Sequence, residues 1–169
     1  TTKSDKATSE STDHSANDQS DSAQAPHNLS KLVVIGTTIA LLIIGVVVFY
    51  PEYHIRNIQA ALRDHNLELA KSHVDSLQAF PFTNKAEVHF LTARLERRRG
   101  DYDQMNAFLE QAQAEGYDAV MIQRERILAA AQAANLEMAQ PKLAELLNDP
   151  RGDEREICEA YIIGFLQFQ

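Results

Sequence analysis

The segment NLELAKSHVDSL, residues 66–77, recurs as DYDQMNAFLEQA at residues 101–112 and as NLEMAQPKLAEL at residues 135–146. Successive copies begin 35 and 34 residues apart. The fifth, ninth and twelfth positions of each copy are apolar, which is the spacing of one helix face. These apolar residues are Ala70, Val74, Leu77, Met105, Leu109, Ala112, Ala139, Leu143 and Leu146. A period of this length predicts helical hairpins that stack on one another, each too small to be stable alone.

The copies define three units after the apolar stretch described below, and these units resemble tetratricopeptide repeats of a membrane-anchored, bacterial type. The units are roughly His54 to Phe82, Phe82 to Gly116 and Tyr117 to Pro150. The stretch from Ala86 to Asp118 matches best, through its Gly100–Asp103 turn and through Leu109 and Ala112 in the second helix. The resemblance implies an all-α fold, with residues 51–169 forming a superhelical solenoid that binds proteins.

The first helix of each unit departs from the family pattern. His54, His89 and Gln123 stand where the family prefers Trp, and Asn57, Thr92 and Arg126 stand where it prefers Leu. The fold expectation therefore rests on the period and on the second helices. Pro141 lies within the second helix of the third unit, where we expect a mild kink because proline removes a backbone donor.

Residues 32–50, LVVIGTTIALLIIGVVVFY, contain no charged side chain. As a helix they span about 28 Å, close to the thickness of a bilayer core. Tyr50 and Tyr53 stand where an interfacial aromatic belt would lie. A core helix of a soluble protein rarely lacks a polar face over such a length. A cleavable signal peptide would be shorter and would end in a small-residue site. The stretch therefore predicts a single-pass transmembrane helix.

Residues 1–31 form an acidic tail almost without large apolar side chains, and we expect Thr1 to Asn28 to be disordered. Basic residues give only a weak topology signal. Lys31 precedes the apolar stretch, whereas Arg56, Arg63 and Lys71 follow it, which slightly favours a cytoplasmic repeat domain and leaves the side open. The chain starts at Thr1, so a fragment of a longer protein is one interpretation.

The C-terminal segment predicts one more amphipathic helix. Its apolar residues at helical spacing are Ile157, Tyr161, Phe165 and Phe168. This face caps the third unit, adjoins further repeats beyond Gln169, or supports self-association.

The sequence gives no support for catalysis, a metal or a cofactor. The histidines of the domain lack the H-E-x-x-H pattern, and no glycine-rich phosphate loop is present. Cys158 is the only cysteine, which excludes an internal disulfide, and it lies in no nucleophile motif. A net charge of -8 disfavours nucleic-acid binding. The tripeptides Arg151–Asp153 and Asn28–Ser30 match adhesion and glycosylation motifs, which we interpret as chance.

Arginine placement is the best functional candidate. Tetratricopeptide first helices line a concave groove, and the positions expected on or near it are Arg56, Arg63, Arg94, Arg97, Arg98 and Arg124. Arg94, Arg97 and Arg98 share one helix face, so their repulsion should be offset. An acidic peptide or a C-terminal carboxylate would offset it. Alternatively, this is a solvated face with Glu87 and Glu96 as local partners.

We therefore expect a membrane-tethered scaffold, not an enzyme, that binds a protein or peptide. The alternative is a regulatory or linker segment of a larger enzyme truncated after Gln169. A catalytic motif further along the reading frame would favour that alternative.

Overall fold

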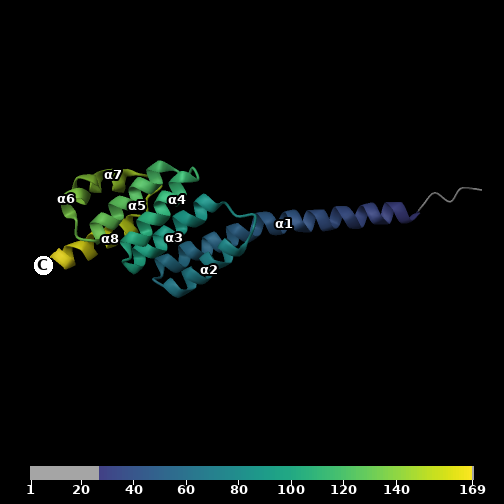
Figure 1. Ribbon diagram of the computed structural model, residues 1–169, viewed down its shortest axis with the longest axis horizontal. Coiled ribbons are helices and arrows are strands. Elements are labelled where there is room, and N and C mark those ends of the chain that lie inside the picture. Colours follow the sequence, from purple (N-terminus) through teal and green to yellow (C-terminus); the bar gives the residue numbers. More distant parts are fainter. Residues whose placement is uncertain (1–26, 169) are drawn as a thin grey trace, which may run out of the picture. The chain divides into compact units, whose positions relative to one another are not determined.

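The computed structural model describes residues 27–168, which contain helices and no strand (Figure 1). This confirms the all-α expectation. The elements are α1 (His27–Arg63), α2 (Leu67–Ala79), α3 (Lys85–Arg99), α4 (Tyr102–Ala114), α5 (Ala119–Gln132), α6 (Leu136–Ala139), the 3-10 turn η1 (Gln140–Lys142), α7 (Leu143–Asn148) and α8 (Glu154–Phe168). The predicted disordered tail lies outside the described residues as far as Pro26, whereas residues 27–31 already belong to α1. The chain divides after Ala40 into two compact units.

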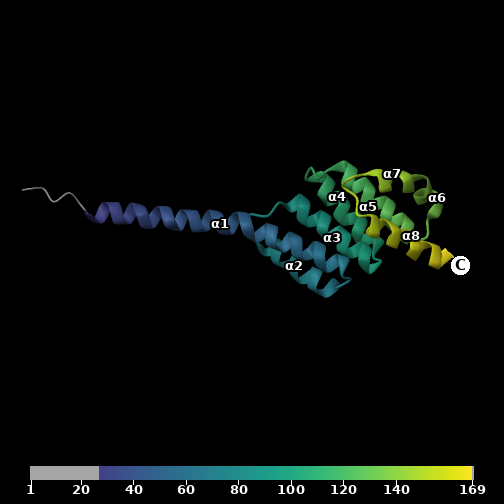
Figure 2. The ribbon, with the colours of Figure 1, turned by 180° about the vertical axis from the view of Figure 1, so that it is seen from behind.

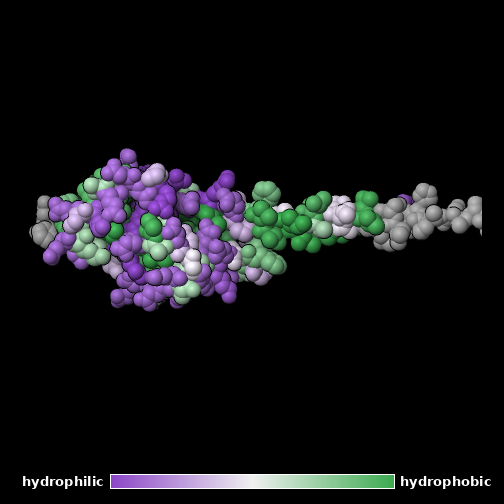
Figure 3. All heavy atoms as spheres, turned by 90° about the horizontal axis from the view of Figure 1, so that it is seen from above, coloured by the Kyte–Doolittle hydropathy of each residue, from purple (hydrophilic) through white to green (hydrophobic). Residues whose placement is uncertain are grey.

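Helix α1 is long and apolar enough to cross a membrane, judged by length and composition. Most of its apolar side chains between Val33 and Phe49 are exposed, and Phe49 is 73% exposed. Figure 3 shows apolar residues along α1, in contrast to the mostly hydrophilic surface of the later helices. The hydroxyls of Thr37 and Thr38 donate to the carbonyl of Val34 at 2.9 and 2.8 Å, so they need no water. The helix runs through Pro51 to Arg63 without ending at Tyr50, so its last turns form the first helix of the first repeat.

The three turns that open the repeated segment share one backbone geometry. Each turn contains one residue with a left-handed backbone conformation: His65 (φ 56°), Gly100 (φ 81°) or Ala134 (φ 59°). The next residue caps the following helix, because the side chains of Asn66, Asp101 and Asn135 each accept a hydrogen bond from the backbone N–H three residues on. The period of 35 and 34 residues is therefore expressed in the backbone as well as in the sequence.

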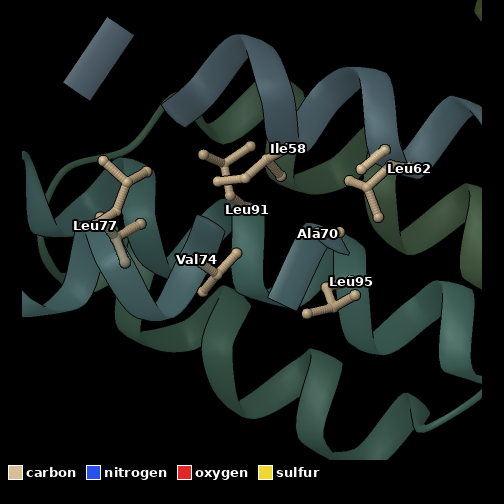
Figure 4. Close-up of a cluster of buried hydrophobic side chains, with 9 residues drawn as sticks. Ile58, Leu62, Ala70, Val74, Leu77, Leu91 and Leu95 are labelled. Carbon is tan, nitrogen blue, oxygen red and sulfur yellow. The ribbon is translucent and has the colours of Figure 1, made fainter. Parts of the chain in front are cut away.

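The repeated apolar positions form the core. Eight of the nine are buried, and Leu143 is partly buried. In the first cluster, Ala70, Val74 and Leu77 of α2 point towards side chains of α1 and α3 (Figure 4). Burying a side chain of this size contributes about 1.5–3 kcal/mol. Because each cluster combines the helices of one hairpin with the helix that follows it, no hairpin buries its apolar face by itself.

Pro141 breaks the second helix of the third unit, where the sequence predicts only a mild kink. Helix α6 begins at Leu136 and ends after four residues, and η1 separates it from α7. Pro141 is the sixth residue from that start and lies beyond the first turn. There its ring conflicts with a carbonyl of the preceding turn and it provides no N–H, so the helix tightens to a 3-10 turn.

Helix α8 packs on the third unit. Ile157 and Tyr161 are buried in a cluster with residues of α5, and the Tyr161 hydroxyl donates to the carbonyl of Ala139 at 2.5 Å. Two of the four residues of the predicted apolar face, Ile157 and Tyr161, are thus covered by the chain's own helices. Self-association through Ile157 and Tyr161 therefore has no exposed surface to use, whereas Phe165 is 50% exposed.

Candidate functional site

A polar cavity of about 240 Å³ lies between α1, α3, α5 and the start of α8. Four helices, α1, α3, α5 and α8, contribute residues to its lining. Its lining residues are Gln59, Arg63, Phe90, Arg94, Met121, Arg124, Glu125, Arg151, Asp153 and Glu156. The cavity therefore combines four guanidinium groups with three carboxylates in a space that could hold one small polar group.

A buried ion-pair network forms one wall of this cavity. Arg97 of α3 pairs with Glu125 of α5, and its Nη2 lies 2.5 Å from a carboxylate oxygen of Glu156 of α8. Arg94 donates to both carboxylate oxygens of Glu156, at 3.0 and 2.9 Å. The Arg98 side chain reaches Glu159 of α8 at 2.7 Å. The network links three helices that are far apart in the sequence.

Opposite charges determine the protonation state of this network. Burial alone would raise the pKa of Glu156, but Arg94 and Arg97 outweigh burial and lower that pKa from 4.5 to about 2. Burial would lower the pKa of Arg97, but Glu125 and Glu156 hold it above its ordinary value. Both groups therefore stay charged over the whole physiological range of pH.

This pKa predicts how stability depends on pH. Because the folded pKa of Glu156 lies below its unfolded value, the contribution of Glu156 is complete above about pH 4.5 and is lost as the pH falls towards about 2. Urea titrations of the full chain in detergent micelles, followed by far-ultraviolet circular dichroism, should show the midpoint falling over this range. A Glu156→Gln variant should be less stable at neutral pH and should show a flatter acid limb. An equally steep acid limb in that variant would contradict the assignment.

Arg124 is the exception among the buried charges. Its side chain belongs to a residue that is 6% exposed, and its Nη1 has no hydrogen-bond partner in the described part of the chain. No ion pair forms between Arg124 and any carboxylate of residues 27–168 within 4.0 Å. The guanidinium packs against the backbone of Gly152, where an added Cβ would lie 2.9 Å from Nη2. A buried donor without an acceptor is unfavourable, and more so on a charged group, so the site favours an anion beside Nη1 of Arg124.

The structure separates the six arginines expected at the groove into three groups. Arg63, Arg94 and Arg124 line the cavity. Arg97 and Arg98 point into the domain and pair with acidic residues of α5 and α8, and Arg97 is only 1% exposed. Arg56 is exposed on α1, pairs with Glu52 and lies outside the cavity. The repulsion within the Arg94–Arg98 face is thus offset by the chain itself, and not by the local residues Glu87 and Glu96.

Two features of the cavity could not be recognised from the repeat pattern. Glu125 and Glu156 look like ordinary surface residues of amphipathic helices, and only their helix registers place them opposite α3. Arg151 belongs to the Arg151–Asp153 tripeptide, which was interpreted as a chance match. In the structure Arg151 pairs with Asp118 and Asp149, at 3.1 Å in each case, and Asp153 caps α8.

Two of the four histidines of the domain, His54 and His73, lie next to each other, and the other two, His65 and His89, lie beside Glu159 and Glu115. Nδ1 of His54 lies 2.9 Å from Nδ1 of His73, a hydrogen-bonding distance between α1 and α2. Within residues 27–168, no group of three or more His, Cys, Asp and Glu side chains is arranged to hold a metal ion. Cys158 is exposed on α8.

Comparisons with protein-family models, curated proteins and solved structures found no match to this chain.

Proposed function

We propose that this protein is a membrane-tethered, tetratricopeptide-like scaffold that binds a protein partner through an acidic group placed in the cavity beside Arg124. In this proposal α1 crosses the bilayer once, and the hairpins from α1 to α8 form a short superhelical repeat array. The observation that carries the proposal is the buried guanidinium of Arg124 in the lining of the cavity, because its Nη1 has no hydrogen-bond partner within residues 27–168.

The surrounding charges support a single carboxylate as the group that is bound. Arg94 and Arg151 already pair with acidic residues of the domain. Arg124 and Arg63, by contrast, form no ion pair within residues 27–168, so two cationic groups remain for a ligand. A carboxylate at the end of a peptide, or on an Asp or Glu side chain, would satisfy Arg124 with charge-assisted hydrogen bonds.

The proposal is tested with peptide arrays probed by the full chain in detergent micelles. Each peptide is presented with a free C-terminal carboxylate, as the corresponding amide, and with its acidic side chains neutralised. Binding should depend on at least one carboxylate, and an Arg124→Gln variant should bind the selected peptide more weakly by about tenfold or more. Equal binding by the wild-type chain and the Arg124→Gln variant would exclude the proposed site.

The matched control is Arg126→Gln, two residues along α5 and outside the cavity lining. This variant should bind as the wild-type chain does. Arg124→Gln removes an unpaired buried charge, so its urea midpoint should be unchanged or higher. If Arg124→Gln instead lost several kcal/mol of stability, Arg124 would be a structural residue and the proposal would fail.

A further inference from the structure

The loop between α2 and α3 lies beside the end of the apolar part of α1. The ring centroids of Tyr50 and Phe80 are 4.5 Å apart, and those of Phe80 and Phe82 are 5.8 Å apart. Tyr50 is the last residue of the uncharged run of residues 32–50. The loop therefore reaches the level along α1 at which a membrane-spanning helix would leave the hydrocarbon. Figures 1 and 2 agree in placing this loop next to α1.

The tip of the loop is apolar and open. Phe82 is 67% exposed in a turn, where Gly, Pro, Asn, Asp and Ser are the usual residues, and Pro81 beside it is also exposed. Tyr53, one turn beyond the uncharged run, is 60% exposed. Tyr53 is of the residue type found in interfacial belts, where an apolar ring and a polar edge meet the lipid headgroups, and Phe82 adds an exposed apolar ring.

The backbone of the loop is also suited to a poorly hydrated environment. The hydroxyl of Thr83 lies within hydrogen-bonding distance of the carbonyl oxygens of Leu77 (2.7 Å) and Phe80 (2.5 Å). The N–H groups of Phe80 and Thr83 donate to the carbonyls of Leu77 and Phe80, and Pro81 has no N–H. These internal bonds reduce the cost of removing the loop from water.

We propose that the Phe80–Phe82 loop is a second membrane contact, which inserts its aromatic side chains into the lipid interface beside α1. The partner is the bilayer surface, because the exposed aromatic residues continue the apolar surface of α1 that ends at Tyr50. This inference rests on the proposed transmembrane role of α1. Two points of attachment would hold the hairpins in a fixed orientation on the membrane.

The absence of Trp from the sequence makes the test direct. Single Phe82→Trp, Phe49→Trp and Leu69→Trp variants of the full chain are reconstituted into phosphatidylcholine vesicles, with or without bromine on the acyl chains. Brominated lipid quenches a Trp only at short range. Phe49 lies in the apolar run, and Leu69, 46% exposed, lies at the other end of α2 from the loop. Far-ultraviolet circular dichroism checks that all three variants fold alike.

The inference expects brominated lipid to reduce the emission of the Phe49→Trp and Phe82→Trp variants by about half or more, and to leave the Leu69→Trp variant unchanged. Quenching of Phe49→Trp without quenching of Phe82→Trp overturns the loop contact and leaves the anchor intact. An unquenched Phe49→Trp variant overturns the anchor, and the loop contact with it. Quenching of Leu69→Trp to the same extent as Phe82→Trp overturns a contact specific to the loop.

Discussion

Replacing Arg97 by Met should lower the free energy of unfolding by about 3–5 kcal/mol, because it leaves buried Glu125 without its main partner and buried Glu156 with fewer cationic partners. Arg97 is 1% exposed and is held by Glu125, by Glu156 and by Oε1 of Gln132 at 3.0 Å. Met preserves most of the aliphatic packing, so the loss reports the charge. The measurement is a urea titration of the full chain in detergent micelles, followed by far-ultraviolet circular dichroism.

Arg99→Met is the matched control for this change. Arg99 lies two residues along the same helix, and its side chain is 27% exposed, with its nearest partner Glu96 at 3.1 Å. An ion pair of this kind contributes at most about 1 kcal/mol. A double variant, Arg97→Met with Glu125→Gln, should recover part of the loss, because it removes one of the unpaired charges. Equal stabilities of the Arg97→Met and Arg99→Met variants would show that the network does not stabilise the fold.

Replacing Gly164 by Ala should detach α8 from α5. A Cβ at Gly164 would overlap the carbonyl oxygen of Ala131 and would lie 3.0 Å from the carbonyl carbon of the same residue. Both atoms belong to the backbone of α5, so no side-chain rotation relieves the overlap. Overpacking of this kind costs about 1–3 kcal/mol, and more where backbone must move. The measurement is the rate of amide hydrogen exchange, which should increase throughout α8.

Helix propensity gives the Gly164 prediction its sign. Ala is favoured over Gly by about 1 kcal/mol in a helix interior, so an unpacked α8 would become more stable after the change. Ile162→Ala, at a residue of α8 that is 57% exposed, is the control and should alter stability by less than about 0.5 kcal/mol. Slower exchange in α8 of the Gly164→Ala variant would show that the two helices do not approach as closely as described.

The two predictions concern one interface, and they separate its polar and apolar parts. Arg97 reaches Glu125 of α5 and Glu156 of α8, whereas Gly164 brings the backbones of these two helices together. If both changes weaken the docking of α8, the acidic wall of the cavity depends on the same contact. Peptide binding should then fall in both variants, even though neither residue lines the cavity.

The sequence by itself determined the parts of this protein that depend on local periodicity. Apolar residues at helical spacing, repeated every 34 or 35 residues, predicted the second helices and most of their buried faces. A run of 19 residues without charge predicted a helix long and apolar enough for a membrane. These features are readable because hydrophobic spacing, turn residues and proline act within a few residues along the chain.

Only the tertiary structure decided which charges are available to a ligand. Arg97 and Arg124 look alike in the sequence, yet Arg97 meets Glu125 and Glu156, while Arg124 has no hydrogen-bond partner for its Nη1 within residues 27–168. The pairs join residues 28 to 62 positions apart in the chain. Their formation depends on the rotation and closeness of packed helices, which a single sequence does not specify. The cavity beside Arg124 is a consequence of that packing.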